Sequence, residues 1–120
     1  MNSDTIATTV LDDWKDAIDQ HDPERVATHF TEDALFQGLR PTHSLGRQGV
    51  IDYYASQPIG LTAAYRILDI TRLGADAILV YLSVDFGFAD RPTLPVHLTV
   101  VLRQVAGAWL ISHYHVSKVD

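Results

Sequence analysis

The sequence predicts an α+β fold in which helices come first and a mostly antiparallel sheet follows. Apolar residues recur at helical spacing early in the chain, whereas later they alternate with polar residues over long stretches. Short turn sequences, not helices, separate these later segments. Helices followed by consecutive strands are typical of an α+β architecture and not of a doubly wound parallel sheet. The length of 120 residues favours one domain, residues 1–120.

Two helices are predicted at the start of the chain. The first covers about residues 4–20, is capped by Ser3 or Asp4, and presents Trp14 inward. Residues 22–24, Asp-Pro-Glu, then supply an N-cap, a first-turn proline and a first-turn acid. They predict a short second helix that places Phe30 on its inner face.

The remaining elements follow from a change in hydrophobic period. A short strand is predicted over 34–37, a loop over 38–45, and a third helix over 46–55 whose apolar stripe includes Tyr54. Beyond residue 60 the pattern becomes extended, and turn residues divide it into segments. The long strands are predicted at 62–73, 77–88, 95–105 and 108–118.

The faces of the predicted sheet follow from residue parity, because side chains alternate along a strand. The even-numbered residues of 77–88 are all apolar, and so are the even-numbered residues of 96–102, which include Val100. The even face is therefore predicted to cover the helices.

The last strand has two possible registers. A two-residue turn at Ala106-Gly107 followed by regular pairing places Trp109, His113 and His115 on the inner face. A three-residue bulged turn shifts the register by one residue and sends Tyr114 inward instead.

Composition excludes several classes of function. The chain contains no cysteine, so disulfides, thiol nucleophiles and iron–sulfur sites are excluded. Its net charge of −6 argues against nucleic acid as a partner. The apolar runs are far shorter than a membrane span, and the N-terminus carries no signal-peptide pattern, so a cytoplasmic protein without membrane contact is expected.

Several motifs occur in one order along the chain. Trp14, the Asp-Pro-Glu break at 22–24, Phe-Thr-Glu-Asp-Ala at 30–34, Gly-Arg-Gln-Gly-Val at 46–50 and the ending at 107–117 together resemble the nuclear transport factor 2-like superfamily. The branches most similar are the SnoaL-like and SgcJ/EcaC-type proteins and the association domain of calcium/calmodulin-dependent protein kinase II. The Trp-x-Ile-x-His-x-His-x-Ser pattern near the C-terminus is the most specific part.

This resemblance implies a cone-shaped, cystatin-like fold in which a strongly curved sheet wraps around three N-terminal helices and leaves a pocket at its open end. It also implies a homodimer, often through the outer face of the sheet. Activities within the superfamily range from isomerases, dehydratases and cyclases to proteins that only bind or assemble, so the fold does not settle the function.

The candidate catalytic residues are His113, His115 and Asp33. Two imidazoles on an apolar inner face suit proton transfer near neutral pH, whereas the structural alternative is a hydrogen bond to the backbone or a place in an interface. His-x-His can also begin a metal site, but no third ligand is evident, so neither a metal nor another cofactor is expected. Asp33 can orient a histidine or act as a base, or it can be a solvated acid at a helix end.

The candidate substrate-binding residues are aromatic and apolar, with one cation. Aromatic rings around a concave site hold apolar ring systems, although most such rings in a small domain form the core. A tyrosine hydroxyl or an arginine can polarise a carbonyl oxygen, although a surface ion pair is the plainer role of the arginine. The other histidines, His21, His29 and His43, are interpreted as surface residues. The substrate-binding candidates are Trp14, Phe30, Phe36, Arg47, Tyr54, Val100 and Trp109.

Three functions remain open from the sequence. The first is an isomerase-, dehydratase- or cyclase-type enzyme that transfers protons on an apolar, ring-containing carbonyl compound. The second is a non-catalytic binding protein for a small apolar molecule. The third is a homo-oligomeric association module.

Overall fold

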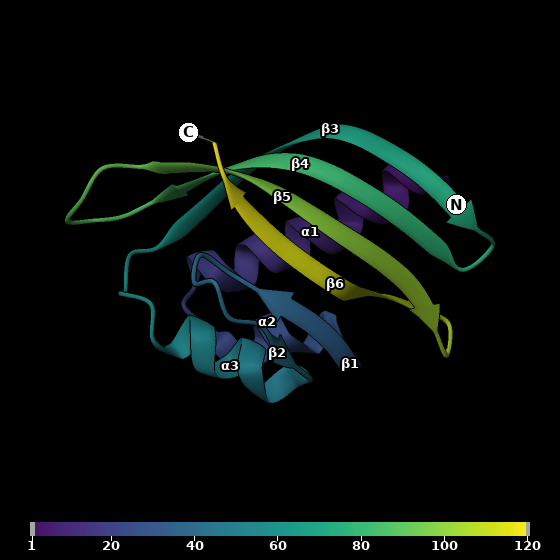
Figure 1. The fold of residues 1–120 in the computed structure, drawn as a ribbon, viewed down its shortest axis with the longest axis horizontal. Helices are drawn as coiled ribbons and strands as arrows, with labels where there is room; N and C mark the ends of the chain where they lie inside the picture. The colour runs from purple at the N-terminus through teal and green to yellow at the C-terminus, as the bar shows by residue number, and fades with distance from the viewer. Residues whose placement is uncertain (1, 120) are drawn as a thin grey trace.

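The computed structural model describes residues 2–119, in which a curved six-stranded sheet wraps around helices on its concave side (Figure 1). The predicted α+β class is confirmed. The helices are α1 (Ser3–Asp19), α2 (Pro23–Thr28) and α3 (Arg47–Ala55), and the strands are β1 (Phe30–Gln37), β2 (Ser44–Leu45), β3 (Thr62–Gly74), β4 (Ala77–Gly87), β5 (Leu94–Val105) and β6 (Ala108–Lys118).

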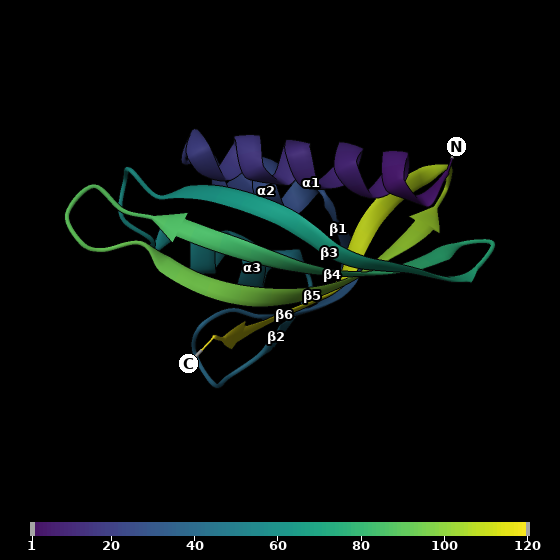
Figure 2. The same cartoon turned by 90° about the horizontal axis from the view of Figure 1, so that it is seen from above.

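Helix α1 lies lengthwise against the sheet, as the view from above shows (Figure 2). Its apolar stripe is buried as predicted, and Trp14 at its centre is fully enclosed. The N-cap is Asn2, not Ser3 or Asp4, because the Asn2 side-chain oxygen accepts the Thr5 N–H at 2.8 Å. That bond satisfies one of the unpaired amides of the first turn.

The second helix is shorter than predicted. Asp22 caps it by accepting the Arg25 N–H, as expected, but the helix ends at Thr28. Phe30 therefore begins β1 and does not belong to the helix. The reason is tertiary, because Phe30 pairs with Ile111 of β6, a residue far along the chain.

Strand β1 joins the two halves of the chain. The strand order is β2-β1-β6-β5-β4-β3, and every neighbouring pair is antiparallel except β1 and β6, which run parallel. The predicted strand 34–37 is the second half of β1, while the first half was predicted as the end of a helix. The predicted loop at 38–45 ends in the short strand β2.

The even-numbered residues of β4 and β5 face the helices, as predicted from parity. The even positions 78–86 of β4 and 96–102 of β5 are buried, whereas their odd neighbours are half-buried or exposed. Val100 and Val80 oppose each other at the centre of this inner face, and both are fully enclosed.

Strand β6 follows neither predicted register completely. The two-residue turn is confirmed, because Val105 pairs with Ala108 and both turn residues have positive φ values, +50° at Ala106 and +84° at Gly107. The pairing then shifts, since Leu102 faces Ile111 but Val101 faces His113. Ser112 is the extra residue of a β-bulge, which reverses the inward and outward positions beyond it.

Candidate functional site

The bulge at Ser112 removes the two histidines of β6 from the inner face. Tyr114 occupies the position opposite Val100 that regular pairing assigned to His113. His113 is half-buried and His115 is exposed, both on the outer face, with their ring centroids 6.3 Å apart. The prediction that they line the interior is wrong, because one extra residue reverses the alternation.

Asp33 and Arg47 also lie away from the interior. Asp33 is exposed and pairs with Arg103 across the sheet at 2.8 Å. The pKa of Asp33 is lowered, mainly by an interaction with the Thr31 side chain and also by the charge of Arg103. Arg47 donates from Nε to the Phe30 carbonyl at 2.8 Å and lies 3.8 Å from Glu32, so it anchors the start of β1.

The predicted aromatic residues come together in the interior, where they pack on one another. Phe36 stacks on Tyr114 with 4.6 Å between centroids, and Phe30 contacts both rings. Trp14 lies 6.1 Å from Tyr114. Trp109 is only half-buried and lies outside this cluster, near the β5–β6 turn. Most of the predicted binding residues are therefore core residues in this conformation.

A polar pair lies inside this aromatic core. The hydroxyls of Tyr54 and Tyr114 are 2.9 Å apart, and both side chains are almost completely buried. Burial raises the pKa of both tyrosines far above the ordinary value of a phenol, so both remain protonated at neutral pH. Since the pair forms one hydrogen bond between two O–H groups, one hydroxyl hydrogen is left to donate elsewhere.

The indole N–H of Trp14 adds a third donor. Its interaction with the Tyr54 hydroxyl lowers the pKa of Tyr54 and so opposes the rise that burial causes. Within residues 2–119, however, no acceptor meets hydrogen-bond geometry for its nitrogen. The free hydroxyl hydrogen and the Trp14 N–H are two donors without an acceptor, and such donors can hold the oxygen of a carbonyl group.

Two small cavities flank Tyr54, each of about 10 Å³, and Tyr54 and Leu61 line both of them. A space of that size holds at most one water molecule. One cavity is also lined by His21 and Asp22, and the other by Gln57. The two spaces therefore lie next to each other and share Tyr54 and Leu61 as walls, and together we call them the interior site.

His21 has an unusual backbone for a residue with a side chain. Its φ is +51°, and it ends α1 with its N–H bonded to the Ile18 carbonyl, while the Asp22 N–H bonds to Ala17. Glycine usually occupies such a position, and another residue costs about 1 kcal/mol there. This turn places His21 at the cavity beside Tyr54, although the sequence predicted a surface residue.

Sequence reasoning missed Tyr114 as a defined interior residue and His21 as a cavity residue. The apolar residues of β6 fall on both parities, so alternation alone cannot locate a bulge. For His21 the available signal was its place between a long helix and an Asp-Pro N-cap, but that position does not reveal which side chains lie opposite.

Two other histidines have lowered pKa values. Burial is the main cause at both, with the charge of His115 acting in the same direction at His113. At His29, Asp13 opposes the shift and Arg25 adds to it. His29 is half-buried, so its interpretation as a surface residue is wrong.

These shifts predict that acid destabilises the fold. Below the ordinary histidine pKa of about 6.5, the unfolded chain binds more protons than the folded chain, so the free energy of unfolding falls as the pH drops through that range. Urea unfolding at pH 7.5 and 5.5 measures the difference. His29→Gln and His113→Gln should each reduce this difference in the free energy of unfolding, whereas His43→Gln, at an exposed position, should not. The same difference in the native chain and in all three variants would contradict the prediction.

The fold and the site together define a class of protein: an α+β cone whose curved sheet encloses a small, mostly apolar site. A family model described as the SnoaL-like domain matches residues 7–120, and the chain belongs to this family, as its resemblance predicted. A search of curated proteins found no match.

Solved structures share the fold at low identity. A ketosteroid isomerase-like protein from Erwinia carotovora atroseptica aligns with a TM-score of 0.78 and 20% identity over 100% of this chain and 99% of its own. A candidate scytalone dehydratase from Novosphingobium aromaticivorans aligns with a TM-score of 0.83 and 17% identity, over 97% of this chain and 83% of its own. A candidate calcium/calmodulin-dependent protein kinase II association domain from Xanthomonas campestris aligns with a TM-score of 0.81 and 18% identity, over 100% of this chain and 89% of its own. Such identities support the shared fold alone.

Residues 2–119 contain no group of three His, Asp or Glu side chains placed to hold a metal ion. Among their helices, none is both long and apolar enough to cross a membrane.

Proposed function

We propose that this protein binds a small, apolar, ring-containing carbonyl compound in the interior site and catalyses a proton transfer of the isomerase, dehydratase or cyclase type. The observation that carries this proposal is the buried hydroxyl pair of Tyr54 and Tyr114 in an otherwise apolar interior. The ketosteroid isomerase-like and scytalone dehydratase neighbours support the same class of chemistry.

The tyrosines would stabilise the negative charge that develops on the carbonyl oxygen when a proton leaves the neighbouring carbon. Because both remain protonated, the pair keeps one free O–H hydrogen that can bond to this oxygen, while neither tyrosine carries a charge. Their apolar surroundings strengthen each bond relative to the same bond in water. The Trp14 N–H would provide a further donor.

His21 is the residue that we assign as proton acceptor. It lines the cavity beside Tyr54, and a neutral imidazole can take a proton from one carbon and return it to another. This role replaces the one predicted for His113 and His115, which the bulge places on the other face. The ligand displaces Leu61 to join the two cavities around Tyr54.

The test uses 3-cyclohexenone, whose conversion to the conjugated 2-cyclohexenone moves one proton and is followed by ultraviolet absorbance. We expect turnover above the buffer rate and a change in the Trp14 indole N–H signal by NMR. Tyr114→Phe should lower kcat by about 100-fold, as removal of one oxyanion donor does. His21→Ala should also lower kcat, while Tyr65→Phe, outside the site, should leave it unchanged.

The two readouts separate binding from chemistry. A shift of the Trp14 signal without turnover would support the alternative of a binding protein and contradict the enzyme. No shift at millimolar probe, with no turnover, would contradict both the site and the function.

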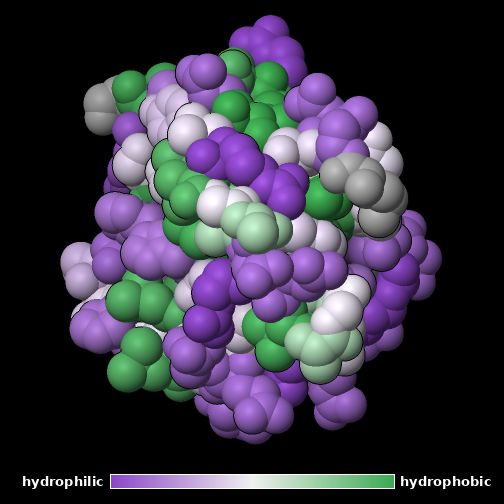
Figure 3. All heavy atoms as spheres, turned by 90° about the vertical axis from the view of Figure 1, so that its right-hand side faces the viewer, coloured by the Kyte–Doolittle hydropathy of each residue, from purple (hydrophilic) through white to green (hydrophobic). Residues whose placement is uncertain are grey.

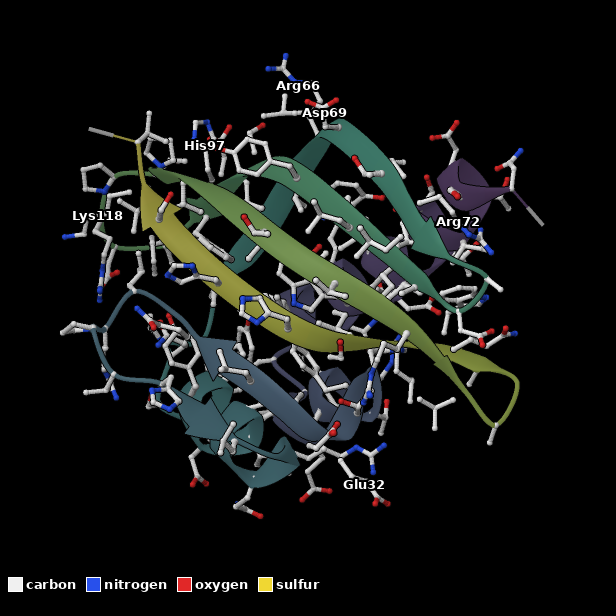
Figure 4. The ribbon with its side chains drawn as sticks, turned by 45° about the vertical axis from the view of Figure 1, so that its right-hand side comes forward. Glu32, Arg66, Asp69, Arg72, His97 and Lys118 are labelled. Carbon is white, nitrogen blue, oxygen red and sulfur yellow. The ribbon has the colours of Figure 1, made fainter. Side chains whose placement is uncertain are left out.

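We also propose that two copies of the chain associate through the outer face of the sheet. Its centre carries half-buried, uncharged side chains, which we call the outer patch. Arg66 and Asp69 border it and point outward from β3 (Figure 4), so a second copy can pair opposite charges around an uncharged centre. The outer patch consists of Leu35, Leu79, Tyr81, Thr99 and Val101.

A further inference from the structure

A second cavity, separate from the interior site, lies between α1 and the β5–β6 hairpin. It measures about 220 Å³ and shares no lining residue with the cavities around Tyr54. This end of the molecule faces the viewer in Figure 3, where small hydrophobic areas alternate with hydrophilic ones. Its walls are formed mainly by Ile6, Thr9, Val10, Asp13, His29 and Trp109.

The apolar walls of this cavity suit a hydrocarbon body. Ile6 and Val10 are buried residues of α1, one turn apart, and the half-buried Trp109 lies across from them on β6. The Arg72 guanidinium lies 5.3 Å from the centre of the Trp109 ring. Arg72 is itself held by the carbonyls of Gly74 and Ala75, near the first turn of α1 (Figure 4), so the indole is a fixed wall.

The polar groups of the cavity favour a cation. Asp13 is exposed on α1, and its carboxylate is the formal charge among the lining side chains. Burial lowers the pKa of His29, which favours its neutral imidazole. A neutral imidazole offers a lone pair that accepts a hydrogen bond.

His29 is fixed in place by its backbone. Its carbonyl accepts the Ile111 N–H at 2.7 Å, which ties the end of α2 to β6. Its Nε2 atom is enclosed and has no hydrogen-bond partner within the described residues. A buried polar atom without a partner is uncommon in native structures, and a bound ligand or water is one explanation.

We propose that this cavity binds a small organic ammonium ion with an aromatic or aliphatic body. Asp13 pairs with the ammonium group, the His29 ring turns so that Nε2 accepts one of the N–H hydrogens, and the body lies against Ile6, Val10 and Trp109. The net charge of −6 on the chain attracts such a cation from solution.

The experiment titrates the protein with phenethylamine hydrochloride at pH 7.5 and follows the ring signals of His29 and the indole N–H of Trp109 by NMR. We expect saturable shifts of both signals. The neutral analogue 2-phenylethanol, which has the same body without the charge, should bind at least about tenfold more weakly, since one paired charge is worth about 1.4 kcal/mol or more in a partly buried site.

Two variants with the same change in net charge complete the design. Asp13→Asn should weaken phenethylamine binding about tenfold, whereas Asp90→Asn, at an exposed position between β4 and β5 away from the cavity, should leave it unchanged. Equal binding of the amine and the alcohol, or equal losses in the two variants, would overturn the proposal. Addition of 3-cyclohexenone should not displace the amine, so this result stands or fails independently of the interior site.

Discussion

Replacing Trp14 with alanine is expected to lower the free energy of unfolding by about 3–5 kcal/mol. The side chain is fully enclosed and contacts the rings of Phe86 and Tyr114 at centroid distances of 6.5 and 6.1 Å. Removing it leaves a cavity where α1 meets the concave sheet. Since single domains are stable by about 5–15 kcal/mol, this one change removes a large share of the total.

Urea unfolding followed by circular dichroism measures this effect without relying on tryptophan fluorescence. Trp109→Ala is the matched control, because the same side chain is removed from a half-buried position outside the aromatic core. We expect its loss to be clearly smaller. Equal losses in the two variants would contradict the central role assigned to Trp14.

Val100→Asp is expected to prevent folding, whereas Val101→Asp should leave a folded chain. Val100 is completely buried between Val80 and Tyr114, so an aspartate there carries an unpaired charge into the core. Val101 points to the outer face, where a charged side chain remains hydrated and changes stability by about 1 kcal/mol or less.

Circular dichroism and sedimentation velocity test this pair of adjacent residues together. A folded Val100→Asp protein would contradict the assignment of the inner face. If two copies associate through the outer patch, the native chain should sediment as a dimer and Val101→Asp as a monomer. A native chain that sediments as a monomer, or a dimer that survives Val101→Asp, would contradict the proposed interface.

The candidate site depended on features that alternation alone does not specify. The aromatic residues of the interior were recognisable, because Trp14 and Tyr54 fall on apolar helical stripes. The partner of Tyr54 was not, since Tyr114 reaches the interior only through the bulge at Ser112. The position of His21 at the same cavity depends on how α1 ends and where α2 begins. No local sequence pattern indicates that His21 and Tyr54 line the same cavity.

Local sequence determined most of the elements and the inner faces of β4 and β5. The apolar stripe of α1, the Asp-Pro start of α2 and the alternation along β4 and β5 each favour one structure locally. On these strands one parity is almost entirely apolar and the other is mixed, so burial of the apolar parity is favoured.

Tertiary structure decided the first half of β1 and the face of each residue late in β6. Phe30 follows a helix directly, but parallel pairing with Ile111 draws it into the sheet. On β6 both the odd and the even positions carry large apolar residues, so the alternation of side chains does not decide which face is buried. Packing of Tyr114 against Phe36 and Trp14 accompanies the bulged arrangement, and the two histidines consequently face outward.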